Sequence, residues 1–94
     1  MEDFSEGWTT GLFEDMSEAE AAVKSMTAML NRFNKATIVI GVDKNGDPSG
    51  IRLSNADAET FRRIMSSKMN RIPETSITLE DDGDSHLMIV RATG

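Results

Sequence analysis

The chain has 94 residues, a formal net charge of −6 and no cysteine. This length suits one domain, and without cysteine the chain has no disulfide, thiol nucleophile or thiolate metal site. No apolar run approaches the roughly 20 residues of a membrane helix, and the acidic N-terminus is unlike a basic signal peptide. We therefore expect a single cytoplasmic domain over residues 1–94, without a membrane partner, in which residues 1–16 form a loose segment or an edge strand.

The negative charge is unevenly distributed along the chain. Residues 1–23 carry a net charge of −7, residues 24–71 carry +5, and residues 72–94 carry −4. Because the whole chain is acidic, its net charge argues against nonspecific binding to nucleic acid. Its central segment, however, is basic. A surface with mixed charges that serve solubility explains the same pattern, so both interpretations stay open.

The first two predicted elements are an edge strand over residues 8–13 and an amphipathic helix over residues 17–33. Ser17 and Glu20 have the spacing of a capping box at the start of this helix. Apolar residues then recur at helical spacing on one face. They are Ala22, Val23, Met26, Met29, Leu30 and Phe33. This register predicts that Phe33 lies in the core, although Phe33 and Trp8 also have the aromatic rings on which bases stack.

The next predicted element is a central strand over residues 37–42, TIVIGV, which is apolar on both faces and rich in β-branched residues. Asn45-Gly46 suits a type I′ hairpin turn, so we expect a return strand over residues 50–53. Pro48 lacks an N–H group and therefore weakens the start of that strand.

A second helix and a C-terminal hairpin complete the pattern. Ser54 and Asn55 are good helix caps, and Pro73 ends the helix. Its predicted buried stripe is Ala58, Phe61, Ile64, Met65, Met69 and Ile72. Ile77 and Leu79 alternate with polar residues before an Asp82-Gly83 turn and a strand over residues 87–90. The predicted fold is α+β, with two amphipathic helices packed on one face of a mixed four- to five-stranded sheet, in the order (β)αββαββ.

The sequence partly matches known functional motifs, but it lacks residues that these motifs require. Gly41 and Gly46 have P-loop spacing, but Asp47-Pro48 follow where a lysine and a hydroxyl are required. Residues 43–54 begin like an EF-hand loop, but Pro48 occupies the glycine position and Ser54 the glutamate position. His86 is the single histidine, and a lone histidine is more often a structural strand residue than a base. We therefore assign no catalytic residue, no metal site and no cofactor.

The order of these elements and their motifs resembles the Schlafen/Alba-like DNA-binding domain family, also described as a divergent AAA region. The resemblance runs from about residue 19 to residue 92. It rests on Ala28, Leu30 and Asn31 at the helix end, residues 37–43 (TIVIGVD), Asn45-Gly46, Gly50-Ile51, Ile72-Pro73 and residues 87–90. The chain departs from the family where Lys35-Ala36 replaces a Gly-Gly turn. It also ends where the family continues into another strand, so we expect a fragment of a longer protein.

The resemblance implies a nucleic-acid-binding accessory domain of a bacterial or archaeal transcriptional regulator or helicase-like protein, binding DNA or RNA without catalysis. The basic central segment supplies the candidate residues. They are Arg32, Lys35, Lys44, Arg62, Arg63, Lys68 and Arg71. One alternative is a protein-interaction module that docks on a neighbouring domain or forms a homo-oligomer. Another is a metal-dependent RNase of the Schlafen type, for which Glu2, Glu6 and Asp43 are the nearest acidic candidates.

Overall fold

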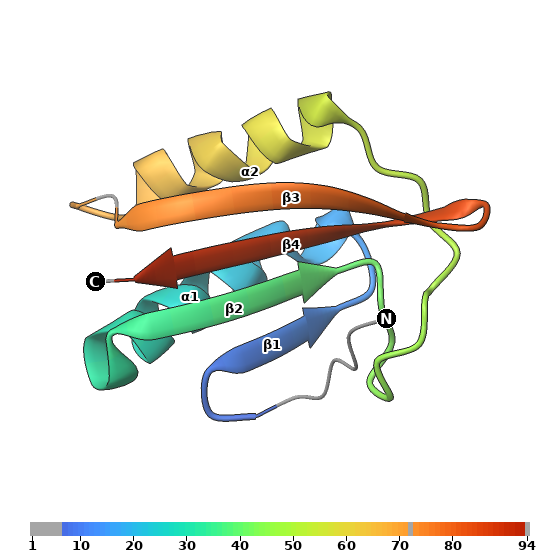
Figure 1. Ribbon diagram of the computed structural model, residues 1–94. Coiled ribbons are helices and arrows are strands. Elements are labelled where there is room, and N and C mark those ends of the chain that lie inside the picture. The colour runs from blue at the N-terminus through green and yellow to red at the C-terminus, as the bar shows by residue number, and fades with distance from the viewer. Residues whose placement is uncertain (1–6, 72, 94) are drawn as a thin grey trace.

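The computed structural model describes residues 7–71 and 73–93. Its elements are β1 (Thr10–Phe13), a 3-10 turn η1 (Met16–Glu18), α1 (Ala19–Phe33), β2 (Lys35–Ile40), α2 (Asn55–Lys68), β3 (Glu74–Asp82) and β4 (Ser85–Thr93). The strands form one sheet in the order β1-β2-β4-β3. β1 pairs with β2 in parallel and the other pairs are antiparallel. Both helices lie on one face of the sheet (Figure 1), so the predicted α+β class with a mixed sheet is confirmed.

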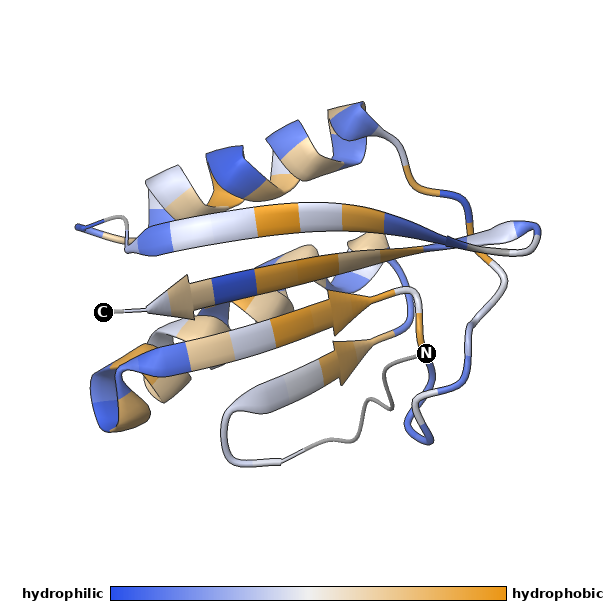
Figure 2. Ribbon diagram, in the orientation of Figure 1, coloured by the Kyte–Doolittle hydropathy of each residue, from blue (hydrophilic) through white to orange (hydrophobic). Residues whose placement is uncertain are grey.

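The main core lies between the two helices and the sheet. Ala22, Val23 and Met26 of α1 and Phe61 and Met65 of α2 are almost completely buried there. From the strands, alternate residues face the helices, which is the two-residue period of a pleated sheet. These strand residues are Ala36, Ile38, Ile40, Met88, Val90 and Ala92. Figure 2 shows the resulting apolar band along β2 and β4, and the hydrophilic residues of α2.

β2 is a central strand with apolar side chains on both faces, as predicted. Ile38 and Ile40 face the helices, whereas Val39 belongs to a second buried cluster with Leu12, Val42, Leu87 and Ile89. The strand ends at Ile40, and Gly41 directly after it has φ +110. A Cβ atom at this position would lie 2.5 Å from the carbonyl oxygen of His86. Glycine is therefore required here both for its backbone conformation and for the close approach of β4.

The segment between β2 and α2 differs from a regular hairpin. Gly46 has a positive φ but Asn45 does not, so the turn is not type I′. The Asp43 carboxylate organises it instead, because Oδ1 accepts from the N–H groups of Asn45 at 2.8 Å and Asp47 at 3.1 Å. The element order is consistent with the predicted (β)αββαββ. After the turn, however, the pairing is a single bridge between Val42 and Pro48 rather than a strand over residues 50–53.

The two helices begin differently. The predicted capping box of Ser17 and Glu20 is wrong, because Asp15 caps the 3-10 turn before α1 and accepts from the Ser17 N–H at 2.9 Å. α2 begins as predicted after Ser54, whose N–H donates to Oδ2 of Asp57 at 2.8 Å. α1 ends at Phe33 and is capped by Asn34, a left-handed residue with φ 61 whose N–H donates to the Leu30 carbonyl oxygen at 3.0 Å.

Candidate nucleic-acid interface

Most of the acidic residues in the described chain lie at one end of the molecule, whereas four exposed cations lie at the other end together with Glu74. Both helices begin at the end that also carries the β3–β4 turn, and both end at the opposite side (Figure 1). We call the first the acidic end. It carries Glu14, Asp15, Glu18, Glu20, Asp43, Asp47, Asp57, Glu80, Asp81 and Asp84. We call the second the basic end, which is defined by Arg32, Lys35, Lys68 and Arg71.

The cations of the basic end come from two separate parts of the chain. Arg32 lies in the last turn of α1 and Lys35 begins β2, whereas Lys68 ends α2 and Arg71 follows it. All four side chains are exposed. In the part of the chain that the structure describes, none of the four forms an ion pair within 4 Å of a carboxylate. Their charge is therefore available to an anionic ligand.

Helix stability explains part of this arrangement. Cations in the last turn of a helix interact favourably with the partial negative charge of its C-terminus, which is about half an elementary charge. Arg32 and Lys68 occupy such positions. The two helix ends together offset only about one positive charge, and Lys35 and Arg71 lie outside the helices. The basic end therefore keeps a net positive potential after this effect is counted.

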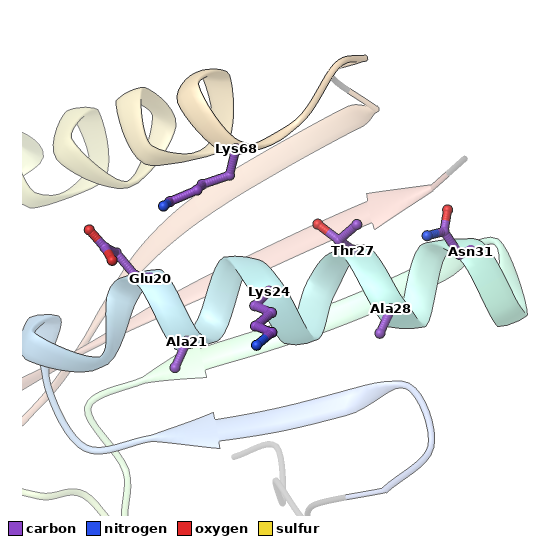
Figure 3. Close-up of a pocket in the computed structure, with 7 residues that line it drawn as sticks. All are labelled: Glu20, Ala21, Lys24, Thr27, Ala28, Asn31 and Lys68. Carbon is purple, nitrogen blue, oxygen red and sulfur yellow. The ribbon is translucent and has the colours of Figure 1, made fainter.

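A groove of about 740 Å³ opens between the ends of the two helices. Its charged lining residues are Lys68, Arg71 and Glu74, and the asparagines Asn31, Asn34 and Asn70 lie beside them. Amides and cations are the groups that donate hydrogen bonds to phosphate and sugar oxygens. Figure 3 shows an adjoining pocket along α1, in which the Lys68 side chain of α2 extends towards Glu20, and Thr27 lies further along α1.

The structure separates the other three predicted residues from this group. Lys44 lies in the turn after β2, at the acidic end. Arg62 and Arg63 lie in the middle of α2, on its exposed side, opposite the buried Phe61 and Met65. The structure therefore brings together four of the seven residues, and places two others along a helix that leads towards them.

Two exposed aromatic residues also lie at the basic end. Trp8 is 77% exposed and Phe33 is 38% exposed. The prediction that Phe33 belongs to the core is wrong, since Phe33 is the last residue of α1 and the left-handed Asn34 turns the chain away directly after it. The ring centroids of Trp8 and Phe33 are 6.2 Å apart in an edge-to-face arrangement. The Arg32 guanidinium lies 5.7 Å from the Phe33 ring centroid.

The acidic candidates for a nuclease site are distributed differently. The Asp43 carboxylate is occupied by the turn that it organises, and Glu2 and Glu6 lie outside the described residues. Within the described part of the chain, no group of three histidine or carboxylate residues has the geometry to hold a metal ion. His86 serves a structural contact, because Nδ1 accepts from the Leu53 N–H at 2.8 Å and Nε2 lies 3.2 Å from Oδ1 of Asp81.

The comparison with protein families gives the class of this domain. Residues 9–91 match the family model described as Schlafen, AlbA_2. The match covers most of the chain, and the chain therefore belongs to the Schlafen AlbA_2 family, a family of nucleic-acid-related domains. A comparison with curated proteins found no match. None of the described helices is long and apolar enough to cross a membrane.

Proposed function

We propose that this domain binds nucleic acid with its basic end and has no catalytic activity of its own. We place it as an accessory domain of a transcriptional regulator or helicase-like protein. One observation carries the proposal: Arg32, Lys35, Lys68 and Arg71 lie at one end of an acidic molecule, and among the described residues none of them has a carboxylate within 4 Å. Membership of the Schlafen AlbA_2 family supports it.

The charge segregation also favours one orientation of binding. The acidic end repels phosphates while the basic end attracts them, so a nucleic acid that approaches by diffusion meets the groove first. Each phosphate that a lysine or arginine neutralises releases counterions. The affinity should therefore fall steeply as the salt concentration rises, despite the net charge of −6.

The test is a salt titration of oligonucleotide binding by fluorescence anisotropy. The double variant K35Q/R71Q should weaken binding and make the slope of log K against log salt shallower by up to about 0.7 per lost contact on a single strand, or about 0.9 on a duplex. The control K44Q/R52Q removes the same charge near the acidic end, and it should keep the slope of the wild-type protein. Equal slopes for the two double variants would contradict the assignment to the basic end, and absence of binding at low salt would contradict the proposed function.

The variant R62Q/R63Q tests how far the proposed interface extends along α2. If the nucleic acid continues from the groove along α2, this variant should show a reduced slope, intermediate between the wild-type protein and K35Q/R71Q. An unchanged slope would confine the interface to the basic end.

The same charge segregation favours a second candidate function, a protein-interaction module. The acidic end of one copy, or of a neighbouring domain, complements the basic end of another. Sedimentation at two salt concentrations distinguishes this function, because end-to-end association should increase with protein concentration at low salt and disappear at high salt. A constant monomer mass at low salt would exclude self-association as the role of the basic end.

A further inference from the structure

Trp8 and Phe33 are the two large hydrophobic side chains that remain exposed on the described surface. Trp8 leaves 77% of its surface in contact with solvent. Exposed aromatic side chains of this size commonly mark a binding surface when they occur together rather than singly. The two ring centroids are 6.2 Å apart with an angle of 62° between the planes, so the rings are not stacked on each other.

The backbone holds both aromatic residues in place. The Thr37 N–H of β2 donates to the carbonyl oxygen of Thr9 at 2.7 Å, and the Gly7 N–H donates to that of Thr10 at 3.0 Å. The residue after Phe33 closes α1 with its own hydrogen bond to Leu30. A backbone that is ordered before binding loses less conformational entropy when a ligand binds to it.

The charges around this pair indicate what kind of ligand suits it. Arg32 lies against the Phe33 ring, Lys35 follows two residues later, and Asn34 lines the adjacent groove with Lys68 and Arg71. An apolar protein surface would gain nothing from these cations. A planar base that is attached to a phosphate chain uses both features, since its ring stacks on the aromatic face and its phosphates meet the cations.

We propose that Trp8 and Phe33 form a stacking site for an unpaired base, and that the domain therefore prefers single-stranded nucleic acid to a duplex. This inference rests on the proposed function and adds the substrate class. Bases inside a duplex are already stacked on each other and show no free face to a side chain, whereas a single strand can turn a base out onto Trp8. Its phosphates then meet the cations of the basic end.

Trp8 is the single tryptophan of the chain, so its fluorescence reports the site directly. The probes are an oligothymidylate, an abasic oligonucleotide of the same length and charge, and a duplex. We expect the oligothymidylate to quench Trp8 fluorescence and to bind about tenfold more tightly than the abasic strand. The variants lack the tryptophan, so their binding is followed by the anisotropy of a labelled strand. W8A should lower the affinity for the oligothymidylate towards that for the abasic strand, and W8F should restore most of the preference.

The possible results of this experiment test the stacking site and the proposed function independently. Equal affinities of the wild-type protein for the base-containing and abasic strands, with both weakened in K35Q/R71Q, would overturn the stacking site and leave the proposed function standing. Equal weakening of both strands in W8A would also overturn it, because a stacking residue acts on the base alone. If neither strand binds at low salt, both proposals fail. Urea unfolding of W8A controls for folding, and F33A should reduce the preference in the same direction as W8A.

Discussion

The two ends of this molecule differ in how far their polar and charged groups have partners within the described structure. At the acidic end, loop and strand backbones are tied together, because the Leu53 N–H reaches His86, the His86 N–H reaches the Ile51 carbonyl, and Ser49 Oγ donates to the Glu14 carbonyl at 2.7 Å. At the basic end, Arg32, Lys35, Lys68 and Arg71 form no ion pair in the described structure, and Trp8 is largely exposed.

This difference predicts which substitutions should change the stability of the fold and which should change ligand binding. A side chain whose hydrogen bonds and close contacts are satisfied inside the protein contributes to the free energy of unfolding. An exposed cation without a partner contributes little to it and remains available to a ligand. Changes at the acidic end should therefore lower stability, whereas changes at the basic end should lower binding.

The largest expected effect is that of G41A at the acidic end. Alanine would have to adopt a positive φ and place its Cβ 2.5 Å from the His86 carbonyl oxygen, so the start of β4 must move. We expect a loss of about 3 kcal/mol in the free energy of unfolding in urea. The control is G50A, which has φ +84 but no atom within 4 Å of its Cβ and should lose only about 1 kcal/mol. Equal losses would show that the close approach of β4 has no energetic consequence.

The second prediction concerns His86 and the segment that it holds. In H86L the Leu53 N–H loses its acceptor, and we expect a loss of about 1–2 kcal/mol in urea unfolding. The variant H86N loses the contact with Asp81 as well, but its amide oxygen takes the position of Nδ1 and accepts from Leu53. H86N should therefore be more stable than H86L, and the opposite order would contradict a structural role for this hydrogen bond.

The third prediction tests the basic end with the same measurement. The single variants K35Q and R71Q should each change the free energy of unfolding by no more than about 0.5 kcal/mol, because both side chains are exposed and neither forms an ion pair with a residue that the structure describes. A larger loss from either variant would show that these cations stabilise the fold, and the contrast between the two ends would then break down.

The smallest effect is expected from the pH dependence of Asp15. Hydrogen bonds from the Ser17 side chain and from the Ser17 backbone N–H hold the pKa of this carboxyl below its ordinary value of 3.8. A lowered pKa in the folded state means that the charged carboxylate stabilises the fold above the ordinary pKa. This contribution is lost as the pH falls through 3.8 and below.

Thermal unfolding between pH 6 and about pH 2.5 provides the measurement for Asp15. The variant D15N should lose less stability over this range than the wild-type protein, and S17A should behave similarly because it removes the side-chain donor. Parallel curves for D15N and the wild-type protein would show that Asp15 has no role in the acid sensitivity of the helix start.

The elements could be predicted largely because each has a local signal. Ser54 and Asn55 marked the start of α2, the apolar run TIVIGV marked β2, and Asp82-Gly83 marked the turn of the hairpin. The capping of α1 could not be predicted with the same certainty, since Asp15 and Ser17 are both good caps and the choice depends on where β1 ends. Helical periodicity placed Phe33 on the buried face, but it carries no information about where the sheet stops covering the helix.

The candidate interface shows the same division between local and long-range information. By itself the sequence determined that residues 24–71 are basic within an acidic chain, because net charge is a property of composition. Only the tertiary structure decided which of these cations act together. Both helices run from the same end of the sheet, so residues 32–35 and 68–71 meet although more than 30 positions separate them, while Lys44 lies at the other end. The exposure of Trp8 beside Phe33 was likewise decided by the pairing of β1 with β2, since a chain contact between such distant segments leaves no periodic signal in the sequence.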